Sequence, residues 1–93
     1  MRLVNTTNSN SELIKEQLEN TDAHLVETYS LGNTTVIYTQ ARTHDNLIVL
    51  NKKRAVRDTE IDFVVQHLFK TTCNDPKIEV IHCDYFIEIS LDK

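Results

Sequence analysis

A two-residue turn between two strand-like segments constrains the fold of this chain more than any other feature. Residues 24–31 and 34–41 are rich in β-branched and aromatic side chains, and the pair Gly32-Asn33 alone separates them. Because glycine adopts positive φ without steric strain, this pattern predicts a β-hairpin with a two-residue turn. The turn sets Tyr29 opposite Val36, so we expect an antiparallel ribbon with apolar groups on both faces.

Glycine is otherwise absent from the sequence, and Pro76 is the single proline. Loops that bind nucleotide phosphates need several glycines, which let backbone N–H groups approach the ligand. The sequence therefore excludes a Walker-type loop and a dinucleotide-binding fingerprint, and we expect no cofactor. A length of 93 residues fits a single domain, residues 1–93, and 40% hydrophobic with 26% charged residues is ordinary for a globular protein.

Two segments are expected to be helical. Ser9 precedes Glu12 by three residues, the spacing of a capping box, and so predicts the start of a first helix. A second helix is predicted from about residue 59 to residue 70, because its apolar residues recur on one face. Those residues are Ile61, Val64, Val65, Leu68 and Phe69. The second helix has the stronger apolar face, so we expect it to anchor the core.

Three further segments are typical of strands: residues 2–5, residues 47–50 and the closing stretch 77–91. The closing stretch alternates apolar and polar residues, which is the period of a strand. It is longer than a typical strand, so we expect a bend, bulge or tight turn near residues 82–84 that divides it in two.

The element order predicts an α/β fold. Residues 47–50, LIVL, are apolar on both faces, and this favours a sheet that is covered on both sides. Helical crossovers allow parallel neighbours, whereas the hairpin requires antiparallel ones. We therefore expect a mixed sheet of five or six strands with one helix on each face, a three-layer sandwich. The alternative is a two-layer α+β fold with both helices on one face.

Four stretches of the sequence carry a family resemblance: MRLVNTTN, NTDAHLVETYSLGNTTVIYT, NKKR and IDFVVQHLF. Together they resemble a small family of uncharacterised proteins, a domain of unknown function, from streptococci, enterococci and other lactic-acid bacteria. The resemblance covers most of the chain. It implies a bacterial cytoplasmic protein with an α/β fold, and it implies no activity and no site residues.

The amino-terminal sequence and the two cysteines favour the cytoplasm. The start, MRLVNTTNSNS, lacks the apolar stretch of a secretory signal, and the longest apolar run is too short to span a membrane. In a reducing compartment Cys73 and Cys83 are expected to be free thiols.

A basic segment is the first candidate site. Residues 51–58, NKKRAVRD, hold four of the ten basic residues of a chain whose formal net charge is -4. Lys52, Lys53, Arg54 and Arg57 form this local positive group just before a predicted helix, where free N–H groups favour anions. Acidic residues crowd the same helix start, however, and would repel a phosphate: Asp58, Glu60 and Asp62. We therefore favour a solvated loop over a nucleic-acid or phospholigand site.

Metal and catalytic sites are the next candidates. His67, Cys73, His82 and Cys83 are able to bind zinc, but they lack the close paired spacing of structural zinc sites. We expect no metal site, with Cys83 in the core and His82 on the polar face. Carboxylates of the predicted strands offer acid–base pairs only if the strand order brings them together: Glu27, Asp45, Asp84 and Glu88. No nucleophile motif is present, so we expect no catalytic residues.

The closing segment is a candidate interface. Tyr85, Phe86 and Ile87 place apolar side chains on both faces of a strand that lies near a sheet edge. Such a strand recruits another chain by edge addition or face packing, or else Phe86 packs beneath a helix.

The sequence favours a non-catalytic module that binds a protein partner or a second copy of itself as a homodimer. The alternative is a weak nucleic-acid or phospholigand binder that uses the basic segment 52–57. Nucleic acid is the less favoured partner because the chain is acidic overall.

Overall fold

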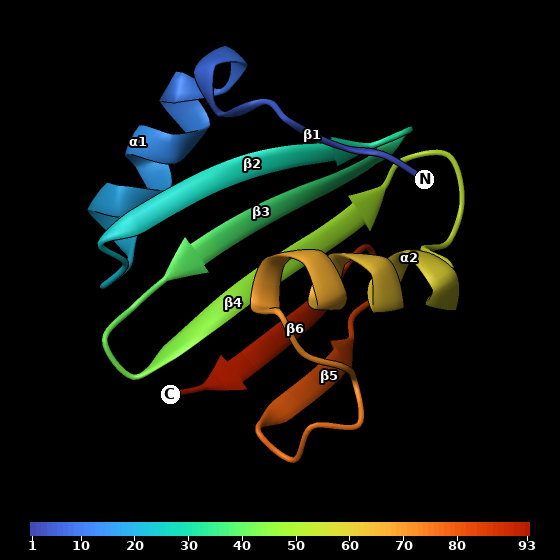
Figure 1. The fold of residues 1–93 in the computed structure, drawn as a ribbon. Helices are drawn as coiled ribbons and strands as arrows, with labels where there is room; N and C mark the ends of the chain where they lie inside the picture. Colours follow the sequence, from blue (N-terminus) through green and yellow to red (C-terminus); the bar gives the residue numbers. More distant parts are fainter.

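Six strands form one sheet in the computed structural model, which describes residues 1–93 (Figure 1). The strands are β1 Leu3–Asn5, β2 Leu25–Leu31, β3 Thr34–Gln40, β4 His44–Asn51, β5 Ile78–His82 and β6 Ile87–Asp92. A 3-10 turn at Thr7–Ser9 leads into helix α1, Ser11–Asn20. Helix α2, Asp58–Val64, continues as a π-helical stretch, Val65–Phe69. The two helices and the sheet make one small α/β domain.

The sheet is antiparallel throughout, with the order β1-β2-β3-β4-β6-β5. The expected mixed sheet is therefore wrong. That expectation assumed that a helical crossover joins neighbouring strands. Helix α2 instead carries the chain from β4 to β5, which run in the same direction, and β6 lies between them. Strands β4 and β5 are therefore parallel but are not hydrogen-bonded to each other.

The predicted hairpin is confirmed. Strands β2 and β3 pair Tyr29 with Val36, as the two-residue turn requires. Gly32 has a φ of 60°, in the left-handed region, and a side chain at this position would meet no atom within 4 Å. Backbone conformation, not crowding, is therefore what requires glycine in this turn.

One face of the sheet packs against α2 and its π-helical continuation to form the core. The core comprises Leu31, Val36, Tyr38, Leu47, Val49, Ile61, Val64, Val65, Phe69, Ile87 and Ile89. The predicted second helix and its inward face are confirmed, with Leu68 packed at the margin of this cluster. Each fully buried aliphatic or aromatic side chain contributes about 1.5–3 kcal/mol before entropy is subtracted. Helix α2 is therefore the main cover of this face.

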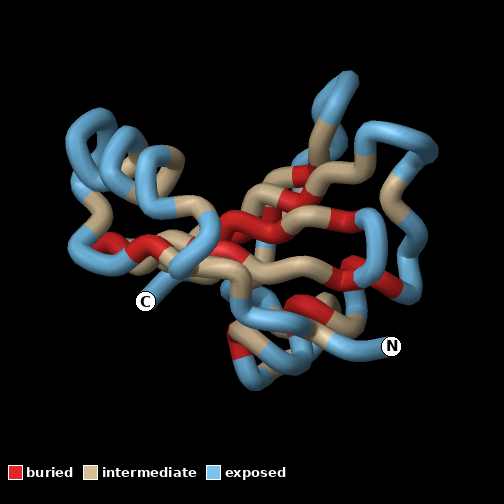
Figure 2. The backbone as a smooth tube through the Cα atoms, turned by 90° about the horizontal axis from the view of Figure 1, so that it is seen from above, coloured by how far each residue is buried: buried red, intermediate tan, exposed pale blue.

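The opposite face of the sheet is covered over part of its width. Val26, Thr28 and Ile37 are buried there, whereas Ile48 and Leu50 of the next strand are half-buried. Helix α1 lies beside β2 and contributes no buried residue (Figures 1 and 2). On this face, residues of β2 and β3 are therefore buried, whereas those of β4 are more exposed to solvent. Neither helix has the length and apolar content needed to cross a membrane.

The first helix begins differently from the prediction. Helix α1 starts after Asn10, and no side chain caps it. The Asn10 amide donates instead to the Thr6 carbonyl at 3.0 Å and to Thr28 Oγ1 at 3.0 Å. The capping box between Ser9 and Glu12 is therefore wrong, because the residues around Ser9 form a separate turn that anchors the segment to β2.

The closing segment is divided in two, as predicted. Strand β5 ends at His82, β6 begins at Ile87, and the Cys83 N–H donates to the Phe86 carbonyl at 3.0 Å across the turn. The strand pairing places His82 on the core side with Ile87, so the expectation of His82 on the polar face is wrong, although the residue is exposed at the end of the strand. Cys83 is exposed in the turn. The expectation of a buried Cys83 is wrong because the turn interrupts the alternation on which it rested.

Candidate functional site

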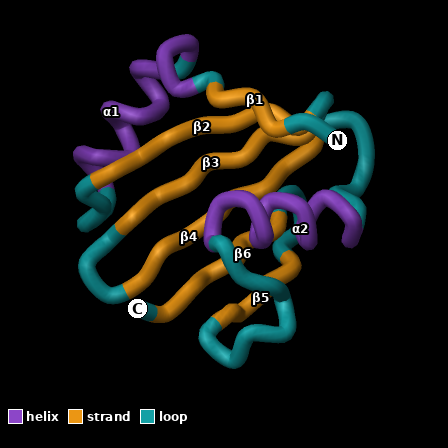
Figure 3. The backbone as a smooth tube through the Cα atoms, in the orientation of Figure 1, coloured by secondary structure: helices purple, strands orange, loops and turns teal.

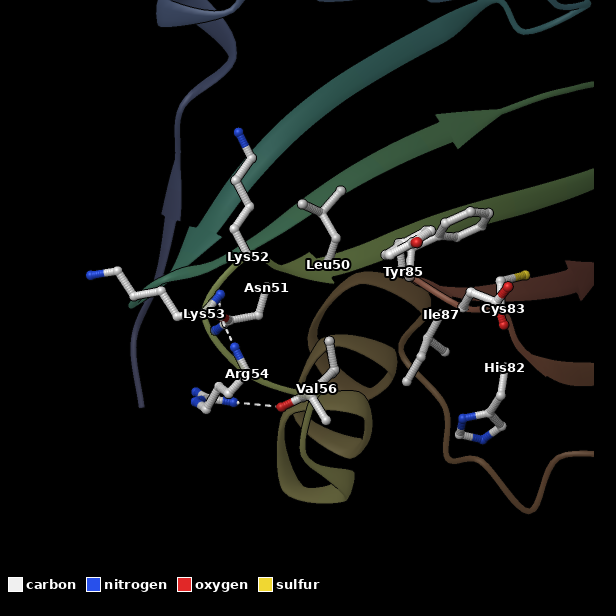
Figure 4. Close-up of a pocket in the computed structure, with 13 residues that line it drawn as sticks. Leu50, Asn51, Lys52, Lys53, Arg54, Val56, His82, Cys83, Tyr85 and Ile87 are labelled. Carbon is white, nitrogen blue, oxygen red and sulfur yellow. Dashed lines mark hydrogen bonds between the residues drawn. The ribbon is translucent and has the colours of Figure 1, made fainter.

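A pocket opens where strand β4 extends beyond its neighbour β6. Val49 is paired with Ile87, the first residue of β6, so Leu50 and Asn51 have no strand partner on that side. The chain leaves β4 through the β4–α2 loop, residues 52–57, and it enters β6 through the β5–β6 turn, residues 83–86. Both connections lie at the same end of the sheet (Figure 3). The space between them is a pocket of about 810 Å³ (Figure 4).

The pocket is lined by residues 50–56 on one wall and residues 82–87 on the other. More than half of the lining is hydrophobic, 7 of 13 residues, so the surface favours an apolar group. The structure thus brings Lys52, Lys53 and Arg54 together with Tyr85, Phe86 and Ile87, which the sequence presents as two unrelated sites. Arg57 does not line the pocket.

Glu60 fixes the wall formed by the β4–α2 loop. Its side chain is 5% exposed and lies 2.7 Å from Arg54 Nη1, and Arg54 Nη2 donates to the second carboxylate oxygen at 3.2 Å. Thr34 Oγ1 donates to the same carboxylate at 2.6 Å, and the Arg57 N–H donates at 3.0 Å. A bidentate pair with two further donors holds the loop against strand β3 and helix α2.

The charge state of Glu60 follows from these contacts. The hydrogen bonds from Arg54 lower its pKa to about 2, assisted by Thr34 and the Arg57 N–H and opposed by burial. The same hydrogen bond raises the pKa of Arg54. Both groups are therefore charged at neutral pH, and Arg54 is committed to an internal partner.

Asn51 fixes the backbone of the same loop. Its Oδ1 accepts from the Lys53 N–H at 2.8 Å and from the Arg54 N–H at 3.2 Å. Its Nδ2 donates to Thr34 Oγ1 at 3.1 Å, so the amide joins the loop to the Glu60 network. An asparagine side chain that bonds the N–H groups two and three residues on is the Asx-turn geometry.

The two lysines of the loop have no ion-pair partner, since the ion pairs of the chain are Arg54 with Glu60 and Lys93 with Asp45. Lys52 and Lys53 are exposed and extend outward from the rim of the pocket (Figure 4). They are free to meet a negative group that approaches the pocket from solvent. Asp58 and Glu60 occupy the first turn of α2, which disfavours an anion at the helix terminus itself.

The wall formed by the β5–β6 turn has fewer stabilising hydrogen bonds than the wall formed by the β4–α2 loop. Tyr85 is 89% exposed, and Cys83 is an exposed free thiol. A single backbone hydrogen bond, from the Cys83 N–H to the Phe86 carbonyl, connects the two ends of this turn. A large aromatic side chain this exposed is a typical contact residue.

A second, smaller pocket of about 330 Å³ lies beside α2. It is polar and is lined by Asp62, Gln66, Thr71, Thr72, Cys73 and Asn74. Burial, together with the hydrogen bond to Asp62 and the charge of Asp62, raises the pKa of the Cys73 thiol to about 11. The thiol is therefore protonated at neutral pH and is a poor nucleophile.

The zinc-competent residues are dispersed, and no three His, Cys, Asp or Glu side chains come close enough to share a metal ion. His67 stacks on Phe63 with ring centroids 4.0 Å apart.

The four carboxylates considered for acid–base chemistry do not form one site. Glu27 and Asp45 lie on the core face of the sheet, where burial and then these two carboxylates raise the pKa of Tyr38. Asp84 is exposed in the β5–β6 turn. Glu27 accepts from Tyr29 at 3.2 Å and Asp45 lies 3.1 Å from Lys93, whereas Glu88 belongs to the other face of the sheet.

Fold and pocket together define a small antiparallel α/β domain with one open surface of mixed apolar and basic character. The chain belongs to the family described as a domain of unknown function, DUF1827, whose model matches residues 1–92. It is also similar to a conserved protein of unknown function from Streptococcus thermophilus LMG 18311. The two sequences are 44% identical, the TM-score is 0.90, and the match covers 100% of this chain and 97% of that chain.

The resemblance found in the sequence is thereby confirmed. A comparison with curated proteins finds no match.

Proposed function

We propose that the protein is a non-catalytic protein-binding module whose partner contacts the pocket between the β4–α2 loop and the β5–β6 turn. The observation that supports this function is the meeting of the exposed Tyr85 and an apolar lining with two lysines that lack ion-pair partners. Exposed aromatic anchors in a partly apolar hollow with a charged rim are the usual composition of a protein-binding hot spot.

The chemistry of the pocket specifies the partner. An apolar side chain of the partner enters between Leu50 and Tyr85, and a carboxylate next to it in the partner lies near Lys52 and Lys53. Opposite charges at the rim guide association, and the apolar contact supplies most of the affinity. The partner is therefore an acidic protein segment that carries at least one large apolar residue.

A nucleic-acid or phospholigand partner is supported less well. Arginine is the residue that binds phosphate in a bidentate manner, and Arg54 already binds Glu60 in that way. Lys52, Lys53 and Arg57 are what remain of the basic segment, on a chain with a formal net charge of -4. Few phosphate contacts on an acidic body give weak binding.

Selection of peptides tests the proposed function. Random 12-residue peptides displayed on phage are selected on the immobilised protein, and the affinities of the selected peptides are measured by fluorescence anisotropy. We expect sequences that combine Asp or Glu with a large apolar residue. The substitutions Lys52→Ser with Lys53→Ser, and separately Tyr85→Ser, should each weaken binding by about tenfold or more.

The matched control is Lys15→Ser with Arg42→Ser, which removes the same charge from two exposed positions outside the pocket. It should leave peptide affinity unchanged. Selected peptides that bind the pocket variants as tightly as the unaltered protein would refute the function. Tight binding of a single-stranded oligonucleotide that is lost on replacement of the two lysines would refute it in favour of nucleic acid.

A further inference from the structure

Strand β5 is an open edge of the sheet, because it pairs with β6 on one side and with nothing on the other. Two bonds show which of its residues face β6: the Asp92 N–H donates to the Lys77 carbonyl at 3.0 Å, and the Cys83 N–H to the Phe86 carbonyl at 3.0 Å. Backbone groups alternate along an antiparallel strand. The odd-numbered residues therefore bond to β6, and the N–H and C=O groups of Ile78, Val80 and His82 point outward.

These outward groups are almost all free. The Ile78 N–H donates to the Asp75 carbonyl at 3.0 Å, but no residue of the chain satisfies the N–H groups of Val80 and His82. Natural sheets protect an edge with a short strand, a proline or a lysine. The opposite edge, β1, is three residues long, whereas β5 has five residues and contains neither proline nor lysine. The β5 edge is thus the longer of the two, with Pro76 and Lys77 just before the strand and Glu79 within it.

We propose that two copies of the protein pair through their β5 strands, antiparallel, around a two-fold axis at Val80. In this register the N–H and C=O groups of Val80 exchange two hydrogen bonds with those of Val80 in the second copy. The His82 N–H of each copy donates to the Ile78 carbonyl of the other, which adds two more. The six-stranded sheets then continue as one sheet across the axis.

A second copy fits this edge because its free groups are symmetric about Val80. An identical strand in the opposite direction presents a donor to each acceptor and an acceptor to each donor, apart from the Ile78 N–H that is already bonded. The side chains also agree, since Glu79 lies directly opposite Ile81 of the second copy and no like charges face each other. Ile81 is 39% exposed in the single chain and gains a neighbour on pairing.

The proposed dimer places the shared strand edge next to the pocket of each copy. His82 ends β5 and also lines the pocket, so the shared edge is continuous with each binding surface. A dimer carries two pockets in a fixed relation, which increases the apparent affinity for a partner with two binding segments. The contact area of one strand pair is small, so we expect a weak and reversible dimer.

Concentration-dependent mass and amide exchange test the pairing. Sedimentation equilibrium between about 10 µM and 1 mM should show the mean mass rising from 10.8 kDa toward twice that value, as expected for a weak reversible dimer. Amide exchange measured by NMR should slow at Val80 and His82 as concentration increases, while the exchange rates in β1 stay constant. A constant mass of 10.8 kDa at all concentrations, or concentration-independent exchange at Val80 and His82, overturns the proposal.

A charge exchange tests the register. Ile81→Glu places a carboxylate opposite Glu79 of the second copy and should raise the dissociation constant about tenfold. Adding Glu79→Lys to that variant should restore pairing, because opposite charges then face each other across the axis. Within the chain, position 79 lies on the same face as Ile81 and Glu88, so Glu79→Lys also changes the charge balance inside one copy. Urea denaturation of both variants measures that internal change separately from the dissociation constant. A double variant that stays as weak as Ile81→Glu overturns the register.

Two controls separate the β5 edge from other surfaces. Val4→Glu changes a residue of similar exposure, 43%, on the opposite edge and should leave the dimer intact. Tyr85→Ser should also leave it intact, because Tyr85 belongs to the pocket. Loss of the dimer in Tyr85→Ser but not in Ile81→Glu would show that the second copy occupies the pocket, and it would overturn pairing through β5.

Discussion

The β4–α2 loop and the β5–β6 turn face each other across one pocket, yet the chain holds them by different means. Side chains hold the loop, since Asn51 bonds two of its N–H groups and Arg54 is bound by Glu60. One backbone hydrogen bond closes the turn, and Tyr85 projects from it into solvent. The lysines thus sit on a preorganised wall, and the aromatic anchor sits on a wall that is free to adjust to a partner.

Removal of Glu60 should have the largest effect on this contrast. The substitution Glu60→Ala leaves Arg54, Thr34 and the Arg57 N–H without their shared partner. We expect the free energy of unfolding to fall by about 2–4 kcal/mol, a large fraction of the stability of a small domain. Urea denaturation followed by circular dichroism measures the change.

The matched control is Glu19→Ala, which removes a carboxylate from an exposed position at the end of α1. It should change the free energy of unfolding by less than about 0.5 kcal/mol. Equal losses in the two variants would mean that the Glu60 network does not hold the loop.

The same carboxylate predicts a dependence of stability on pH. The pKa of Glu60 is lowered from 4.5 to about 2 in the folded protein. The stability that its ionised form contributes is therefore fully present above about pH 4.5 and is lost as the pH falls through about 2. Glu60→Gln should flatten this part of the stability curve. Parallel curves for the two proteins between those pH values would contradict the network.

Local patterns account for the parts of the fold that the sequence predicts. The Gly32-Asn33 turn and the apolar face of α2 depend on residues a few positions apart, and both are confirmed. The sheet topology depends on β6 inserting between β4 and β5, a long-range event that no short pattern records. The alternation around Cys83 continues through the β5–β6 turn, which explains why it indicates the wrong face.

The candidate site also has parts that the sequence indicates and parts that only the fold reveals. Composition alone singles out residues 52–54 and 85–87, but only the strand order joins them in one pocket. Glu60 resembles an ordinary acidic residue of a helix start, but one of its hydrogen-bond donors, Thr34, lies 26 residues earlier in the chain. A buried carboxylate bound to a nearby arginine has no sequence signal of its own.

Asn51 should have an intermediate effect. The substitution Asn51→Ala removes the acceptor of two loop N–H groups and one donor to Thr34. Water replaces part of these bonds because the loop is exposed, so we expect a loss of about 1 kcal/mol in the free energy of unfolding. Asn74→Ala, at an exposed position in another loop, is the control. If both substitutions have the same effect, the Asx turn does not fix the loop.

Tyr85→Ser should have the smallest effect on stability and thereby gives the clearest contrast between the walls. Tyr85 is 89% exposed and its side chain makes no hydrogen bond, so removal of the ring should change the free energy of unfolding by less than about 0.5 kcal/mol. The same substitution is expected to weaken peptide binding by about tenfold or more. Urea denaturation and peptide anisotropy on one protein sample measure both. A substantial loss of stability would mean that Tyr85 supports the turn. The difference in rigidity between the two walls of the pocket would then be smaller than their hydrogen bonds indicate.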